Sequence, residues 1–253
     1  MKNAYLITNN SVTLTLNGIT NVLFRSDKLT EQVIDALRLN DWNRVETLVN
    51  KPKAIKSYYN GFIKVVNGIV YYKNKKLDND VTKKILLFME QDLPYQSLVK
   101  FLARLMKNPD KRCREALYRF MELENIPIND DGMVVAYKSL RKTLKDWYSD
   151  TVQHKIGQTV YWGQRKKERK NTHIEYGNPC GTFFHIGTFE YAKGFNAPDN
   201  VVCLCEVDPA CVKSVPDESS CGKIRVTKYR PIAFYDTNGN ALPQNYYKTN
   251  KVN

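Results

Sequence analysis

The last third of the chain most constrains the fold, because several short segments that each predict a strand or a helix follow one another over Cys180–Ile232. Residues 183–186 are apolar except for the imidazole of His185. Thr188 is a favoured helix N-cap and predicts a short helix after this run. Residues 201–207 are rich in Val, Leu and Cys, which predicts a strand buried on both faces. The order is therefore strand, helix, strand, with one histidine near the centre.

Charged and mostly apolar residues alternate over 223–229, which predicts one half-exposed strand there. The first half of the chain has a different order, in which two β-hairpins are each followed by amphipathic helices. Both hairpins turn at Asn-Gly, the pair favoured in type I′ turns. The turns are at Asn17-Gly18 and Asn67-Gly68, the predicted helix N-caps are Asp27, Asp41, Asp80 and Asp110, and Pro52 is predicted to begin a further short helix.

The turn-rich stretch 126–132 is the predicted joint between two domains. Residues 1–128 are expected to form a domain of hairpins plus a helical bundle. Residues 129–253 are expected to form a β-rich α+β domain. The predicted fold class is therefore α+β, with helices gathered in the first domain and strands in the second.

The amino-acid composition indicates where in the cell the protein is located and whether it binds a cofactor. No run approaches eighteen apolar residues, and the N-terminus lacks the apolar core of a secretory signal. We therefore expect a cytosolic protein, or one that lies on a membrane surface. Six cysteines in such a setting predict reduced thiols. They form no C-x2-C pair, so we predict neither a metal nor any other cofactor.

A net charge of +13 favours partners that carry phosphate, either nucleic acids or anionic lipids. The densest cluster of positive charge is a run that we call the basic loop, residues 165–170. It is either a solvated loop or a surface that contacts the phosphates of nucleic acid or lipid. Its cations are Arg165, Lys166, Lys167, Arg169 and Lys170.

Several motifs, in this order and spacing, resemble the rIIB proteins of T-even and related phages over about residues 11–235. Where this family has Gly-Leu-His-Val, the chain has Phe183-Phe184-His185-Ile186. Many relatives also carry an N-terminal helix-turn-helix, which we expect this chain to lack. The other motifs are Gly68-Ile69-Val70-Tyr71-Tyr72, Lys107-Asn108-Pro109, Asn129-Asp130-Asp131-Gly132 before Ala136-Tyr137-Lys138, Cys180, Tyr191-Ala192, Val207-Asp208-Pro209, Val212-Lys213-Ser214-Val215-Pro216, Lys223-Ile224-Arg225 and Tyr229.

The resemblance implies a role in infection. Proteins like these are early phage products that act with a larger partner, rIIA, near the host inner membrane. They protect the infection against exclusion by resident prophages and influence the timing of lysis. The expected activity is interaction with other molecules, without catalysis, in the host cytoplasm or at the periphery of the inner membrane.

An acid–base site is the alternative interpretation of the polar residues in the second domain. In the other interpretation, His185 donates a hydrogen bond to a backbone carbonyl and stabilises a small sheet. His154 lies in a polar stretch and is expected to be solvated. The candidate catalytic residues are His185, Lys138, Asp146, Ser149 and Arg225, with Cys180 near them in sequence.

A second alternative is an enzyme acting on a nucleotide or NAD. The segments around Ala136-Tyr137-Lys138, Tyr191-Ala192 and Leu204–Val207 resemble parts of ADP-ribosyltransferases. Those enzymes use a late glutamate to polarise a ribose hydroxyl. Glu206 and Glu218 are the glutamates that the last third of this chain offers, and Arg230 stands in the closing strand.

Replacing the five cations of the basic loop by glutamine should reduce the salt dependence of binding to a polyanion. Each phosphate contact that is lost releases about one counterion fewer, so the slope of log K against log salt should fall by up to about 4. Titration of labelled DNA and of anionic vesicles over a salt series measures this slope. Equal slopes for the variant and the parent chain would mean that the loop is only solvated.

Overall fold

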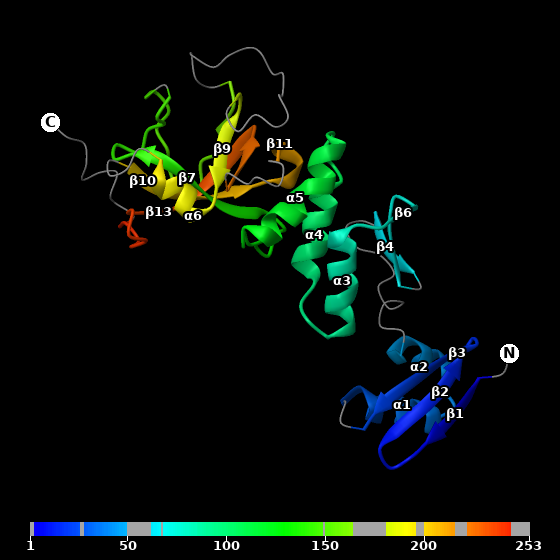
Figure 1. Cartoon of the computed structure of the whole chain (residues 1–253). Coiled ribbons are helices and arrows are strands. Elements are labelled where there is room, and N and C mark those ends of the chain that lie inside the picture. Colours follow the sequence, from blue (N-terminus) through cyan, green and yellow to red (C-terminus); the bar gives the residue numbers. More distant parts are fainter. Residues whose placement is uncertain are drawn as a thin grey trace. The chain divides into compact units, whose positions relative to one another are not determined.

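The computed structural model describes residues 3–25, 28–49, 62–66, 68–148, 150–163, 181–195, 200–215 and 222–243. They belong to two compact units, shown in blue to cyan and in green to red in Figure 1. One unit comprises Met1–Asp78 and Thr82–Pro94, and the other comprises Asn79–Val81 and Tyr95–Asn253. The predicted α+β class is confirmed. The predicted joint near residue 128 falls within the second unit, and the division into domains there stays a prediction.

The first unit begins with an antiparallel sheet of β1 (Ala4–Ile7), β2 (Ser11–Leu16) and β3 (Ile19–Phe24). The predicted hairpin is confirmed, because β2 pairs with β3 and both turn residues have positive φ, 50° at Asn17 and 84° at Gly18. β1 was not predicted from the sequence. Alternate residues of β2 pack with α1 (Lys28–Arg38) and α2 (Trp42–Val49) in one buried cluster.

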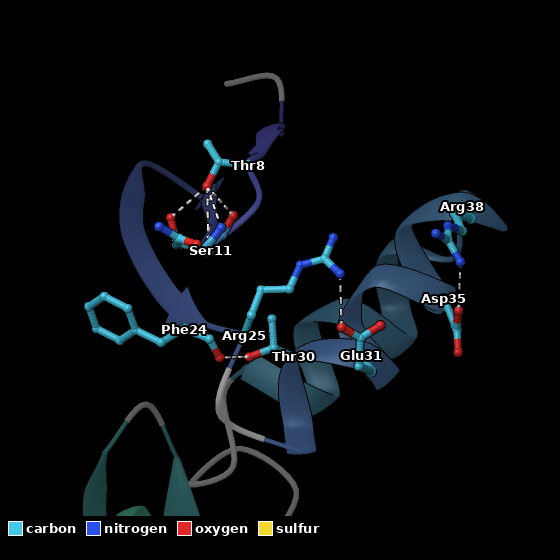
Figure 2. A network of polar contacts seen from close by, with 9 residues as sticks. Thr8, Ser11, Phe24, Arg25, Thr30, Glu31, Asp35 and Arg38 are labelled. Atoms are coloured by element: carbon cyan, nitrogen blue, oxygen red, sulfur yellow. Dashed lines mark hydrogen bonds and ion pairs between the residues drawn. The ribbon is translucent and has the colours of Figure 1, made fainter.

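Side-chain contacts join the end of this sheet to the first helix (Figure 2). The hydroxyl of Thr30 donates to the carbonyl of Phe24 at 2.6 Å, and Arg25 pairs with Glu31 at 3.1 Å. Asp41 caps α2 as predicted, because its carboxylate accepts from the backbone N–H of Arg44 at 3.0 Å. The predicted cap Asp27 and the helix predicted from Pro52 lie outside the described residues.

The second predicted hairpin is also present, with β4 (Ile63–Val66) paired to β5 (Ile69–Tyr72). β6 (Lys75–Leu77) extends it to three strands, and α3 (Asp80–Glu90) follows. Gly68 has a φ of 71°, as the turn requires.

Two helices open the second unit, α4 (Gln96–Leu105) and α5 (Lys111–Leu123). Asp110 caps α5 as predicted, because its carboxylate accepts from the backbone N–H of Arg112 at 2.8 Å. In the break between the helices, the buried side chain of Asn108 donates to the carbonyls of Pro209 and Val212, at 2.9 and 2.8 Å. The break predicted at Asn108-Pro109 therefore ties the helices to the following sheet.

That sheet has the order β11-β12-β9-β7-β10-β13-β8 within the described residues. The inner strand β10 is buried on both faces, as predicted for residues 201–207. The short helix α6 (Phe189–Gly194) packs against β7, β9 and β10, and Thr188 caps it as predicted. The strands are β7 (Val134–Arg141), β8 (Val160–Tyr161), β9 (Phe184–Gly187), β10 (Asn200–Val207), β11 (Val212–Ser214), β12 (Lys223–Val226) and β13 (Lys228–Tyr235).

The single half-exposed strand predicted over 223–229 is wrong. Two strands occupy this region, β12 and β13, separated at Thr227. All four residues of β12 are buried, because this strand lies inside the sheet between β11 and β9. Alternation of charged and apolar residues predicts a strand with one face exposed to solvent. In this strand the charged side chains of Lys223 and Arg225 are buried instead.

Gly132→Ala should destabilise the second unit by about 3 kcal/mol, combining left-handed strain with steric overlap. Gly132 has a φ of 72°, and an added Cβ would overlap the backbone nitrogen of Phe101 and approach the carbonyl carbon of Lys100 to 2.5 Å. Gly157→Ala is the matched control, because Gly157 has a φ of 80° with open space around it. Its cost should be about 1 kcal/mol. Urea unfolding of both variants measures the difference, and equal costs would contradict the close approach.

Candidate functional site

His185 lies on β9 opposite Arg225 of β12, and Lys223 lies opposite Gly187 in the same register. Paired residues of adjacent strands share a face, so these three side chains project from one face of the sheet. Lys138 of β7 reaches the same strand from the other face. Its ammonium group lies 3.4 Å from the carbonyl oxygen of His185 and 5.6 Å from the centres of the Phe184 and Tyr229 rings.

Positive charge surrounds the His185 imidazole. Burial lowers its pKa to about 3, and the charges of Lys223, Lys138 and Arg225 act in the same direction. A hydrogen bond with the Gly181 backbone opposes the shift, as expected if the ring donates to a carbonyl. The interpretation that His185 stabilises the sheet through a backbone carbonyl agrees with this contact. His185 is therefore neutral at pH 7.

The strand that carries His185 starts from a strained residue. Phe183 has a φ of 83°, a region that side chains other than glycine rarely adopt. Its ring packs against Trp162 with ring centres 5.3 Å apart. Glycine adopts such a φ without steric cost. Phe183 therefore has a backbone conformation that favours glycine, two residues before His185.

The expectation that His154 is solvated is wrong. His154 is fully buried, and its Nδ1 donates to the carbonyl of Leu144 at 3.0 Å. Its Nε2 therefore accepts from the hydroxyl of Tyr229, 2.5 Å away. Burial lowers the pKa of His154 to about 4, helped by the charge of Lys138 and opposed by the Leu144 bond and by Asp146. The partner Tyr229 lies far along the chain, so no local pattern could have indicated this contact.

The structure brings together His185, Arg225 and Lys138 from the predicted catalytic set. The buried carboxylate of Asp146 accepts from the backbone N–H of Val152 at 3.2 Å, and its charge acts on His154. Asp146 is not among the groups that shift the pKa of His185. Ser149, Cys180 and the basic loop lie outside the described residues. Lys223 was missed in this role, although its position two residues before Arg225 on a strand places both on one face.

Glu206, the described glutamate of the ADP-ribosyltransferase alternative, forms an ion pair with Arg230. It also accepts from the side chain of Asn129 at 2.8 Å. These two bonds hold the carboxylate of β10 in structural contacts with β13 and with the turn that precedes β7.

Cys203 and Cys205 lie on the same face of β10, as their spacing predicts, with sulfur atoms 3.5 Å apart. Burial raises the pKa of the Cys203 thiol well above its usual value. Both therefore pack as small apolar groups. Among the described residues, no three His, Cys, Asp or Glu side chains gather as a metal site would need. No described helix is long and apolar enough to cross a membrane.

Comparison with known proteins identifies the family. The chain matches the family described as "Bacteriophage T4 protein rIIB" over residues 2–239, and it therefore belongs to the rIIB family of phage proteins. It is also similar to Protein rIIB of Enterobacteria phage T4, with 23% identity over 222 residues. This similarity covers 87% of the chain and 70% of the T4 protein. No solved structure matches the chain.

Unfolding should become easier as the pH falls below about 6.5, because the folded chain keeps His154 and His185 neutral. The pKa is about 4 for His154 and about 3 for His185, and each becomes about 6.5 after unfolding. The unfolded state therefore binds more protons, and stability that is complete above pH 7 is lost towards pH 4. Each histidine should contribute a loss of about 2 kcal/mol at pH 5.

Urea midpoints followed by tryptophan fluorescence between pH 7.5 and 5 measure this effect. His154→Gln and His185→Gln should each remove about half of the pH-dependent loss. A slope that neither variant changes would show that other groups cause it.

Proposed function

We propose that this chain acts as an early phage protein of the rIIB type, without catalysis, in partnership with an rIIA-like protein at the host inner membrane. In this role it protects the infection against exclusion by a resident prophage and influences lysis timing. The observation that carries the proposal is the family match over nearly the whole chain, residues 2–239.

The polar residues of the second unit support an interaction role over catalysis. General acid–base catalysis needs a group whose pKa lies near the working pH. The pKa values of both described histidines lie well below 7. The carboxylates of Glu206 and Asp146 are both engaged in structural bonds. These groups take part in structural contacts within the second unit, which favours a protein that acts through its surfaces.

The first unit supports the same role through its exposed apolar side chains. Leu6 is 64% exposed, Val22 is 52% exposed and Phe24 is 64% exposed. Leu6 and Val22 both pair with Thr13 of β2, so they share the sheet face opposite the buried Val12 and Leu14. Exposed apolar side chains on one uncharged face are typical of surfaces that bind other proteins. The net charge of +13 favours a membrane with anionic lipids.

Infected cells provide the test. A tagged chain should co-purify from the membrane fraction with a larger phage-encoded protein. A phage whose copy is interrupted should plate at least about tenfold less well on a host that carries a prophage than on one that does not. Mass spectrometry of the co-purified material and plaque counts are the measurements.

Val22→Ser with Phe24→Ser should reduce the co-purified partner at least about tenfold. The matched control is Thr13→Ser with Thr15→Ser, on the same face of the sheet but without loss of a large apolar side chain. Recovery of the chain without a larger phage protein, together with equal plating on both hosts, would refute the proposal.

A further inference from the structure

Two enclosed cations lie side by side on the face of β12 that also carries His185 on β9. Lys223 is 8% exposed and Arg225 is 4% exposed. Lys223 pairs with Gly187 and Arg225 pairs with His185, so both cations lie on one face of the sheet. A buried positive charge is costly unless an anion or several hydrogen bonds compensate it.

The ammonium group of Lys223 receives only weak compensation. It lies 5.1 Å from the centre of the Tyr191 ring, and no described carboxylate forms an ion pair with it. A cation–π contact stabilises a buried ammonium less than an anion would. Among the described residues, Lys223 therefore has no anion as a partner.

His185 has an unused nitrogen beside this charge. Its Nε2 is buried and has no hydrogen-bond partner among the described residues. The ring nitrogen that bonds the Gly181 backbone is therefore Nδ1, and it donates because this bond raises the pKa. The neutral ring consequently presents the lone pair of Nε2 as an acceptor. Buried polar atoms almost always have a partner, so an unused acceptor points to a missing donor.

Arg225 is positioned by contacts that leave little freedom. Its Nη2 donates to the hydroxyl of Ser214 at 3.0 Å. A side chain at position 181 would overlap its Nη1, so glycine there makes room for the guanidinium group. The guanidinium adds positive charge to the face that carries Lys223, whatever other contacts it makes.

We propose that the face formed by His185, Lys223 and Arg225 binds a phosphate group that carries one proton. Negatively charged phosphate oxygens lie against Lys223, within the field of Arg225. The phosphate hydroxyl donates to the Nε2 of His185. Phosphate satisfies the cations and the acceptor together, whereas an oxyanion without a proton satisfies only the cations. This site is independent of the proposed role in infection, and either can fail without the other.

Calorimetry of the full chain with inorganic phosphate and with sulfate at pH 7.5 and equal ionic strength tests the ligand class. Phosphate should bind at least about tenfold more tightly, because sulfate has no hydroxyl to offer at that pH. This comparison needs no variant. Equal affinities would overturn the proposal, because they would mean charge attraction alone.

Lys223→Met tests the site, because methionine keeps an unbranched chain over the Tyr191 ring and removes the charge. The matched control is Lys193→Met on α6, whose ammonium lies 5.7 Å from the centre of the Phe189 ring. Lys223→Met should weaken phosphate binding at least about tenfold and Lys193→Met less than twofold. Equal losses in both variants would refute the site.

A nucleoside 5′-monophosphate, compared with inorganic phosphate at pH 6, distinguishes the sources of the phosphate. A phosphate monoester has a second pKa of about 6, so a large share of it still carries the required proton at that pH. Binding at least tenfold tighter than that of inorganic phosphate, and lost in Lys223→Met, would identify a nucleotide as the source. Equal binding of the two would identify free phosphate, and binding of neither would overturn the proposal.

Discussion

The pairing of β10 with β7 on one side and β13 on the other is the interaction on which the second unit depends. β10 pairs along its whole length with β7, and its side chains are buried on both faces. At its start, the Asn200 side chain donates to the carbonyls of Ala192, Lys193 and Phe195, which fixes the end of α6 against the sheet. At its end, Glu206 holds Arg230 of β13. One strand thereby positions both the covering helix and the closing strand.

Burial, together with nearby positive charge, keeps His154 and His185 neutral. Lys138 lowers the pKa of His154 and of His185, so one ammonium group acts on both rings. Burial is the larger cause in each case. His154 offsets that cost with two bonds, to Leu144 and Tyr229. Within the part of the chain that the structure describes, His185 has a backbone bond and its Nε2 has no hydrogen-bond partner, so its ring is less compensated than that of His154.

Local chemistry accounts for what the sequence could predict. Asn17-Gly18 fixed the first hairpin because both residues tolerate positive φ, and Asp41 and Asp110 fixed helix starts because their carboxylates accept nearby backbone N–H groups. The errors came from distant partners. The ring of His154 is enclosed beside Tyr229, and Lys223 is enclosed inside a sheet whose order no single segment contains. The cluster of Lys138, Lys223 and Arg225 around His185 depends on that order, and Lys223 is the member that was not predicted.

A strained backbone at Phe183 lies two residues before His185, whose Nε2 has no hydrogen-bond partner among the described residues. Phe183 at a φ of 83° costs of the order of 1–3 kcal/mol, and the chain retains it two residues before His185. The packing of its ring on Trp162 offsets part of that cost. Among the described residues, the buried Nε2 of His185 has no hydrogen-bond partner, and this costs free energy of folding. An apolar side chain at this position would avoid that cost, so folding of the sheet alone does not explain the histidine. Two local costs retained together, beside buried cations, are better explained by binding at this site than by stability alone.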